Sequence, residues 1–512
     1  MTSPSESRAA PTGDVARRTY GFSEQRRGTR NLGSSRRPRE ILIASFVVLS
    51  TAILAPSLAF AQAQNAAPQS PEDEPPTRRL TLHPAAEPRP ALEYQLLPSL
   101  LDRRPGNAAV LYNKIGLTFR GGPEFKEEWI DNDLPLDKFP REEARKVVEH
   151  WRQVLDDLEL ASRREECNWE LPIHEREFIS LMLPEIEESR AYARLLSLKA
   201  RLQVAEGDFD SAVRTLRTGY AMGRHVAKSP TLVSALVGVV ICSLMDARVE
   251  ELAAQPGAPS LYWALTALPR PLIDFRLAAD SEKSMLFLTY PELRDLHARR
   301  HSPEDWLDLL DKLSDELARV GEIEKQPLGR LTLTGLAMKG YPAAKRRLIE
   351  LGRSPEQVEA MPVAEVVLLY SLEAYEEAHD ATLKWVSLPY WEAAPRLAAI
   401  EQEIAEKYRA KEILPFNIFL TPTAFIGANA RSERNVAILR VIEAIRLYAS
   451  SHDGRLPKNL NEIVDVPVPL DAFTGGPFLY RLDGDVATLE APLPPNLRQQ
   501  AFGARYVLTF AR

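Results

Sequence analysis

The stretch "LPEIEESRAYARLLSLKARLQVAEGDFDSAVRTLRTGYAMGRHV", residues 183–226, is the part of the chain that says most about its fold. Pro184 suits the first position of a helix, and glutamates fill the first turn, where negative charge complements the helix dipole. Gly207 favours a helix end, and Asp208 or Asp210 can cap the helix that follows. Two helices joined by so short a turn lie antiparallel and side by side, so the sequence predicts a helical hairpin.

The middle of this hairpin, "AEGDFDSAVRTL" at residues 205–216, resembles a tetratricopeptide repeat. In that resemblance Ala205 and Ala212 are the small residues where paired helices touch, and Phe209 fills the turn. One unit of roughly 34 residues cannot bury its own apolar face, so further helical pairs are expected beside it. No second stretch repeats the pattern. The resemblance therefore implies helical hairpins and leaves open whether they form a regular array.

Helical spacing of apolar residues continues over 107–412, which predicts a helical domain. Its most apolar helix is "TLVSALVGVVICSLM", residues 231–245, with Ser229 as the expected cap. The run is too short to span a bilayer and is apolar on all sides, so it is predicted to be the central core helix. Small residues four positions apart on it predict close approach of another helix: Ser234, Gly238 and Cys242. Further amphipathic helices are predicted over 303–320, 355–380 and 393–412.

The end of the chain has a different pattern. Residues 413–432 contain two prolines and are interpreted as a connector. The next stretch, "SERNVAILRVIEAIRLYAS", predicts a helix with one apolar stripe and with Glu443 and Arg446 on its outside. Alternation in "FLYRL" followed by Asp-Gly predicts a hairpin, and "YVLTF" a third strand. The predicted fold is therefore mainly α, with a small C-terminal α+β module at 433–512 that holds a three-stranded antiparallel sheet.

This module resembles the periplasmic domain of type II secretion pseudopilins. In that family a helix leads into a DG-x-x-P loop, a D-x-x-x-G-x-P-x-x-Y stretch and a hairpin. The matching residues here are Asp453, Gly454, Pro457, Asp471, Gly475, Pro477 and Tyr480. Family members begin with a processed apolar helix, whereas this module follows a helical domain, so the resemblance implies a fold and leaves the function open. Asp471, Asp483 and Asp485 can offer oxygen ligands for the family's calcium, or serve as turn residues.

Residues 1–61 have the order of a secretory signal peptide: a disordered basic region, the apolar run "ILIASFVVLSTAIL" and the small-residue pattern Ala59-Phe60-Ala61. The sequence thus predicts an exported protein of the periplasm or cell envelope. The alternative is an uncleaved membrane anchor, for which 41–60 is barely long enough. Loss of this segment removes nine Lys/Arg and four Asp/Glu, which moves the formal net charge from −7 to −12. A chain with this negative charge is not expected to bind nucleic acid, because neutralisation of phosphates supplies most of that affinity.

Nine prolines in residues 62–106 predict a Pro-rich linker that holds the folded body away from the export site, with 94–101 packed on the first helix. The chain has only two cysteines, Cys167 and Cys242, too few for a disulfide scaffold. Cys242 lies in an apolar run and is predicted to be a small buried hydrophobe. A single bridge between the two cysteines is left open. The whole mature chain resembles uncharacterised exported bacterial proteins, a likeness that implies no activity.

Few side chains form a pattern typical of chemistry. His297 and His301 have the spacing of metal ligands, but the glutamate of a zincin is replaced by Ala298, so exposed histidines are expected. His174 and Cys167 are the one conceivable Cys/His pair and lack a third member. The sequence contains no GxSxG, P-loop or GxGxxG motif. No catalytic, cofactor-binding or metal-binding residue and no cofactor is predicted.

Three functions remain as hypotheses. The first is a non-catalytic exported envelope protein, a helical scaffold that binds a protein or peptide. The second is an exported hydrolase with a carboxylate site in the helical domain. The third is an accessory component that contacts a secretion system through the C-terminal module. A cleft with converging buried acids would favour the hydrolase, and a concave face lined by Tyr262, Trp263 and Tyr290 would favour binding. The sequence leaves the oligomeric state open.

Overall fold

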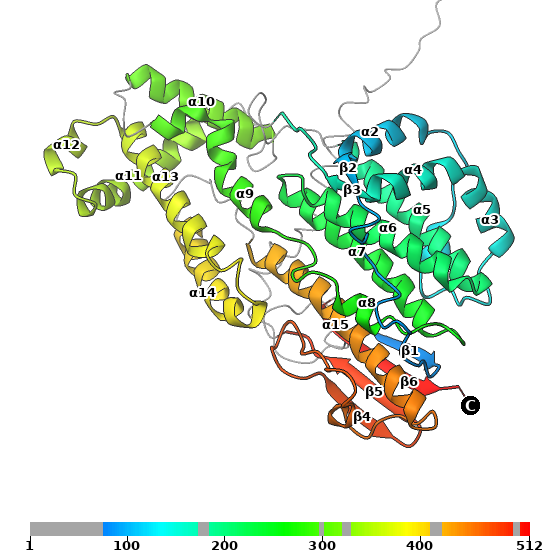
Figure 1. Cartoon of the computed structure of the whole chain (residues 1–512). Coiled ribbons are helices and arrows are strands. Elements are labelled where there is room, and N and C mark those ends of the chain that lie inside the picture. Colours follow the sequence, from blue (N-terminus) through cyan, green and yellow to red (C-terminus); the bar gives the residue numbers. More distant parts are fainter. Residues whose placement is uncertain are drawn as a thin grey trace, which may run out of the picture. The chain divides into compact units, whose positions relative to one another are not determined.

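The structure, a computed structural model, describes residues 75–172, 184–295, 302–319, 329–409, 422–494 and 502–511. These residues are mainly helical, with a small sheet of mostly C-terminal strands (Figure 1), which confirms the predicted fold class at that level. The helices of the described ranges are α2 (Ala108–Thr118), α3 (Arg141–His150), α4 (Arg152–Ser162), α5 (Pro184–Glu206), α6 (Phe209–Val226), α7 (Leu232–Ala253), α8 (Tyr262–Thr266), α9 (Arg276–Thr289), α10 (Pro303–Arg319), α11 (Gly329–Glu350), α12 (Pro355–Glu359), α13 (Val363–Leu383), α14 (Tyr390–Arg409) and α15 (Pro422–Ser451). Short 3-10 turns lie at η3 (Glu127–Ile130), η5 (Pro291–Asp295) and η7 (Leu460–Glu462).

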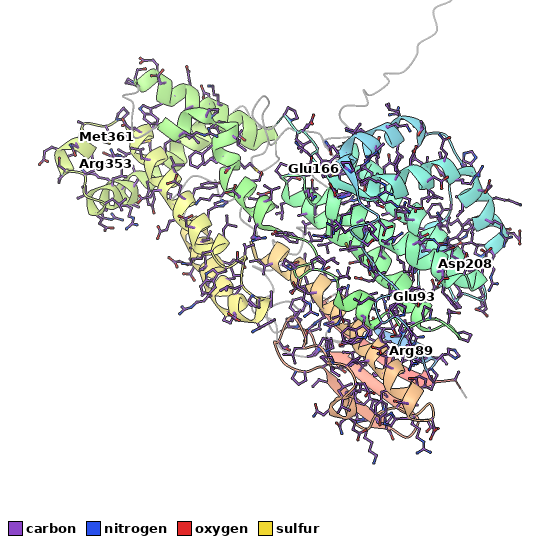
Figure 2. All side chains as sticks on the ribbon, in the orientation of Figure 1. Arg89, Glu93, Glu166, Asp208, Arg353 and Met361 are labelled. Carbon is purple, nitrogen blue, oxygen red and sulfur yellow. The ribbon has the colours of Figure 1, made fainter. Side chains whose placement is uncertain are left out.

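The predicted helical hairpin is formed by α5 and α6. Helix α5 ends at Glu206, and Gly207 follows with a φ of 76°, a conformation that glycine adopts without strain. Asp208, labelled in Figure 2, is the N-cap of α6, and its side chain accepts the backbone N–H of Ser211 at 3.1 Å. Helix α6 packs against both α5 and α7. The local signals for this turn are therefore confirmed.

Helix α7 is a buried core helix, as predicted. A Cβ added to Gly238 would lie 2.6 Å from the main-chain oxygen of Gly223 on α6, so the small-residue stripe does permit close approach. The predicted cap Ser229 is wrong: the N-cap is Thr231, whose hydroxyl accepts the Ser234 N–H at 3.1 Å, because the helix starts one residue later. By length and composition α7 is the one helix of the described ranges that meets the criteria for a membrane span, but 61% of its most apolar window is buried.

Buried apolar side chains form three clusters in the described residues. The first joins α2–α8 with parts of α14 and α15, and the second joins the end of α9 with α10–α13. The third holds α15 against the C-terminal sheet. Helix α9 contributes Ala278 to the first cluster and Leu286 to the second, so it connects them.

The C-terminal sheet has four strands, so the prediction of three was wrong. The strand order is β1-β6-β5-β4, with β1 parallel to β6 and the other neighbours antiparallel. The strands are β1 (Thr77–Leu82), β4 (Leu479–Asp483), β5 (Val486–Ala491) and β6 (Ala504–Phe510). Leu82, which pairs with Phe510, is fully buried in the third cluster, and this burial favours strand addition to the open edge of β6. A separate two-stranded parallel pair is formed by β2 (Arg104–Asn107) and β3 (Arg164–Glu166).

The range 62–106, predicted to be a linker, is packed on the helices where it is described. Beyond β1, the backbone N–H of Ala85 donates to the carbonyl of Arg446 at 3.2 Å, and Trp263 Nε1 donates to Glu87 at 2.6 Å. Leu96 is buried in the first cluster, in line with the packing predicted for 94–101. The linker interpretation is therefore wrong for the strand and its neighbours, because proline content does not prevent alternate residues from being buried.

Helix α15 is buried on more sides than its sequence suggests. Glu443 and Arg446 were predicted outside, and both are fully buried. Arg446 Nη1 lies 2.8 Å from Glu443 Oε1, Nη2 donates to the carbonyl of Ala258 at 2.7 Å, and Nε donates to the carbonyl of His83 at 3.0 Å. Backbone carbonyls from two distant segments thus accept hydrogen bonds from the buried guanidinium of Arg446.

Several predicted boundaries also differ. Helix α15 begins at Pro422, inside the predicted connector 413–432. The helix predicted over 355–380 is split into α12 and α13, because Pro362 separates them. The predicted signal peptide at 1–61 lies outside the described residues.

Candidate binding site around helix α6

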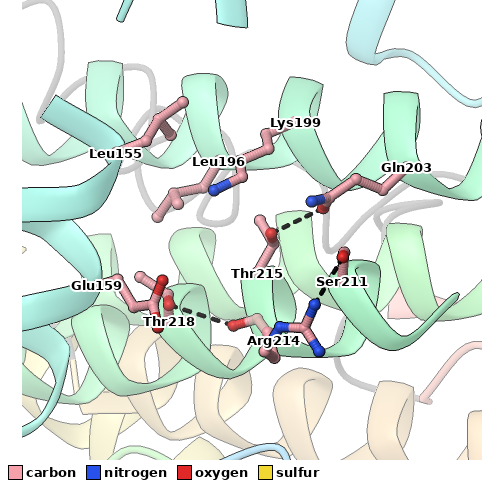
Figure 3. Close-up of a pocket in the computed structure, with 9 residues that line it drawn as sticks. All are labelled: Leu155, Glu159, Leu196, Lys199, Gln203, Ser211, Arg214, Thr215 and Thr218. Carbon is pink, nitrogen blue, oxygen red and sulfur yellow. Dashed lines mark hydrogen bonds between the residues drawn. The ribbon is translucent and has the colours of Figure 1, made fainter. Parts of the chain in front are cut away.

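A polar cavity of about 130 Å³, here called cavity 1, lies where α4, α5 and α6 meet (Figure 3). It is lined by Leu155, Glu159, Leu196, Lys199, Gln203, Ser211, Arg214, Thr215 and Thr218. Thr215 Oγ1 donates to Gln203 Oε1 at 2.7 Å, and Arg214 Nη2 donates to Ser211 Oγ at 2.7 Å. Lys199 makes no hydrogen bond or ion pair with the described part of the chain. Cavity 1 therefore holds an unpaired cation beside an exposed arginine.

A second cavity, of about 340 Å³ and here called cavity 2, lies between residues 93–102 and α6. It is lined by Glu93, Tyr94, Gln95, Ser99, Asp102, Asp210, Val213, Arg214 and Arg217. Arg214 lines both cavities. One face of α6, with Ser211, Thr215 and Thr218, lines cavity 1, and another, with Asp210, Val213 and Arg217, lines cavity 2. Because successive residues of a helix are rotated by about 100°, Arg214 lies between these two faces. The two cavities are therefore neighbours on one helix and share one guanidinium.

Of the acids that line cavity 2, Asp102 is held in its ionised form. Asp102 accepts the hydroxyl of Ser99 at 2.8 Å and pairs with Arg217 at 3.1 Å, and these contacts, the Ser99 bond first, lower the pKa of Asp102. The Tyr94 hydroxyl donates to Asp210 at 3.1 Å, and burial together with that carboxylate raises the pKa of Tyr94 to about 12. General acid catalysis requires a carboxyl whose pKa is raised towards neutrality, so this cavity suits binding better than proton transfer.

Acids with a strongly raised pKa lie elsewhere: burial raises the pKa of Glu282 on α9 to about 8, and Asp246 lies on the second half of α7. Asp246 accepts the hydroxyl of Tyr220 at 2.6 Å. One turn on, Glu250 accepts Arg78 Nη1 and the Tyr506 hydroxyl, each at 2.8 Å. Burial raises the pKa of Asp246 to about 7, and the charge of Glu250 adds to the rise. These contacts join α6, α7, β1 and β6.

A neighbouring set of charges on α7 faces a different direction. Glu251 pairs with Arg201 at 2.9 Å and with Arg248 at 3.4 Å, and Arg248 also contacts the side chain of Asn132. Burial lowers the pKa of Arg248 to about 10. Buried acids therefore do converge on α7, but arginines and tyrosines engage them, and none of them lines cavity 1 or cavity 2.

The aromatic binding face considered from the sequence is not formed. Tyr262 is fully buried, and its hydroxyl donates to the carbonyl of Pro467 and accepts Arg440 Nη2 at 3.3 Å. Tyr290 is buried in the second apolar cluster, whereas Trp263 is half-buried beside the third. Helix α15 covers the helix of Tyr262, so these three residues do not supply the concave aromatic face that would have favoured binding.

The residues considered as metal ligands do not assemble into a site where they are described. His174, His297 and His301 lie outside the described residues. Groups of three or more His, Cys, Asp or Glu placed to hold a metal are absent from the described ranges. Asp471 is buried and binds Arg434 through two contacts of 2.6 Å, so its carboxylate already has a cationic partner. Asp483 is exposed where β4 ends.

Both cysteines are buried free thiols. Burial raises the pKa of Cys167 to about 12, and that of Cys242 rises for the same reason. A thiol with so high a pKa is a poor nucleophile. The prediction of Cys242 as a small buried hydrophobe is confirmed, and the bridge left open by the sequence is not formed.

The loop residues shared with pseudopilins have local structural roles. Asp453 has a φ of 52° and Gly454 a φ of 73°, and the Gly454 N–H donates to the carbonyl of Ala449 at 2.9 Å, which ends α15. The Tyr480 hydroxyl donates to the carbonyl of Pro457 at 2.8 Å, which holds the loop against β4. The motif thus closes the helix and attaches the loop to the hairpin.

Lys199 and Arg214 were not identified from the sequence. The available signal was a polar stripe at helical spacing inside the predicted hairpin, formed by Ser211, Thr215 and Thr218. Such a stripe is unusual at a helix–helix contact, but a cavity forms there only because α4 also packs on α6.

Comparison with models of protein families, with curated proteins and with solved structures finds no match for this chain. The candidate site therefore rests on its geometry.

Proposed function

We propose that the protein is a non-catalytic, exported envelope protein whose helical hairpins bind another protein or a peptide. The observation that carries the proposal is the pair of polar cavities on either side of Arg214. Cavity 2 reaches the lower end of the volume range typical of ligand sites, and segment 93–102 gives it a wall opposite α6. Asp102 has the properties of a binding group, because its contacts with Ser99 and Arg217 lower its pKa.

The proposal includes tetratricopeptide-like packing of the hairpin. Ala212 is fully buried in the first apolar cluster, and Ala205 and Phe209 pack against that cluster, as the resemblance implies. Helix α7 continues the stack, because it packs on both α5 and α6. Consecutive helices that pack in this way provide a rigid surface on which a partner segment can lie.

Site-specific photo-crosslinking tests the proposal. A photo-reactive amino acid replaces Gln95, which is exposed and lines cavity 2, and the same group at Met338, which is 69% exposed on α11, is the matched control. We expect one protein, identified by mass spectrometry, to be captured in the cell envelope from position 95 and not from position 338. Its yield should fall in an Arg214→Gln background. Equal capture at both positions, or none at position 95, would contradict the proposal.

Export is part of the same proposal and is tested separately. We expect the protein of the envelope or periplasmic fraction to begin at Gln62 or Gln64, after the small-residue patterns of the apolar segment. Intact mass measurement of the fractionated protein reads this directly. Recovery of the full-length chain from the cytoplasm would overturn it, whereas a full-length chain in the membrane would favour the uncleaved anchor.

A second candidate function, contact with a secretion system, is favoured by the C-terminal module. Its β4–β5 hairpin turns at Gly484 with a φ of 60°, and β4 is an edge strand with Leu479 56% exposed. An exposed edge strand can pair with a strand of another chain. Crosslinking from Leu479 to a secretion component, with Met338 again as the control, would support this function. Capture of no such component would remove it.

A further inference from the structure

In cavity 1, the side-chain groups without a hydrogen-bond partner are mostly donors rather than acceptors. Because Thr215 donates to the Oε1 of Gln203, the amide nitrogen of that side chain is left to donate. Lys199 contributes an ammonium group with no partner among the described residues. Arg214 uses Nη2 for Ser211, and the described residues take up none of its other donors. Three donor groups, two of them charged, therefore border one small space.

The charge of cavity 1 is positive. Its one acid, Glu159, is engaged by Arg163 one turn along α4. Neither Lys199 nor Arg214 forms a direct ion pair with a carboxylate of the described ranges, and the charge of Arg214 acts on Asp208 only as a secondary contribution that lowers the pKa of that acid. The formal charge of the chain without residues 1–61 is −12, so most of its surface repels anions. The positive charge of cavity 1 attracts them locally.

The size of cavity 1 limits the anion. A space of about 130 Å³ is well below the roughly 300 Å³ at which pockets for drug-sized ligands begin. It holds a few water molecules or one group with the dimensions of a carboxylate. Leu155 and Leu196 form its apolar side, which suits the carbon stem of such a group.

From these observations we infer that cavity 1 is a carboxylate-binding site, in which Lys199 and Arg214 take the two oxygens and Gln203 adds a neutral donor. Charge-assisted hydrogen bonds of this kind are shorter and stronger than neutral ones. The inference extends the proposed function, because the carboxylate would belong to the bound segment as an acidic side chain. The site itself can be tested without the partner.

The test is an NMR titration of the full protein with its lysines ¹³C-dimethylated, a change that keeps their positive charge. The Lys199 signal is identified by its loss in Lys199→Arg. We expect sodium acetate to shift this signal saturably, and sodium chloride at equal ionic strength to leave it in place. Arg214→Gln should weaken acetate binding about tenfold, the value of one charge-assisted bond of about 1.4 kcal/mol. Arg194→Gln, which removes an exposed charge of α5 that pairs with Glu127, should change it less than about twofold.

Two capped peptides separate a free carboxylate from one in a polypeptide. If acetate and an acetylated, amidated Ala-Glu-Ala peptide both shift the Lys199 signal and the Ala-Gln-Ala peptide does not, the inference is supported for a bound segment. If acetate alone binds, the site is supported for small free carboxylates. The absence of a saturable shift with acetate, or equal shifts with both peptides, overturns the inference. Crosslinking from cavity 2 tests the proposed function independently, so the carboxylate site and the proposed function can fail separately.

Discussion

Replacing Asp246 by asparagine should change how the stability of the protein depends on pH. The Asp246→Asn side chain keeps an oxygen to accept the Tyr220 hydroxyl, which lies 2.6 Å from Asp246 Oδ1, but it no longer titrates. In the folded protein burial raises the pKa of Asp246 from its ordinary value of 3.8 to about 7. The group is fully enclosed, so solvent screening does not reduce this effect.

The sign follows from proton binding. Between pH 3.8 and about 7 the folded state keeps the proton of Asp246 and the unfolded state loses it, so the folded state binds more protons. The free energy of unfolding therefore falls as pH rises through this window. At about 1.36 kcal/mol for each pKa unit, the loss is on the order of 4 kcal/mol once both states are ionised. Asp246→Asn lacks this loss, so it should be the more stable protein at pH 8.

Urea unfolding of the wild type and of Asp246→Asn at several values between pH 4 and pH 8 measures the difference. We expect it to grow with pH to a few kcal/mol at equal urea slopes. Asp102→Asn is the control, because the pKa of Asp102 is lowered, so its removal should cost stability above pH 4 and the sign is opposite. Parallel curves for the wild type and Asp246→Asn across the whole range would refute the reasoning that Asp246 is protonated in the folded protein.

Three further predictions concern packing, charge burial and the thiols. Gly238→Ala should lower the free energy of unfolding in urea by about 1–3 kcal/mol, because its Cβ would lie 2.6 Å from a main-chain oxygen of α6. Gly335→Ala is the control and should not lower it, because no atom lies within 4 Å of the added Cβ. Equal effects of the two substitutions would mean that α6 and α7 do not approach so closely. Arg434→Met should cost about 3–5 kcal/mol by the same measurement, because it leaves Asp471 buried without its cation. Asp471→Asn in the same chain should restore part of the loss. No recovery would show that the cost does not come from the unpaired charge of Asp471, and would assign it to packing and to the bonds of Arg434 with the carbonyls of Pro492 and Phe502. The two buried cysteines should react with a thiol reagent only after unfolding in guanidinium, and rapid reaction of the native protein would contradict their burial.

The sequence determined the elements whose signals are local. Pro184, Gly207 and Asp208 set the ends of the hairpin helices because each acts through its own backbone geometry or its own cap. The β4–β5 hairpin followed from alternation and an Asp-Gly turn in the same way. The small-residue stripe of α7 predicted close packing because the absence of a side chain permits it wherever the partner lies.

Only the tertiary structure decided which distant segments meet. Strand β1 pairs with β6 across most of the chain, and no local pattern distinguishes an edge strand from an extended linker. Glu443 and Arg446 read as a solvated pair, yet they are buried because carbonyls from remote loops satisfy the arginine. The same holds for cavity 1: Lys199 and Arg214 are ordinary charges on two helices until a third helix closes the space beside them. A side chain's neighbours, which fix its burial, charge state and ligands, depend on contacts that periodicity along one segment does not encode.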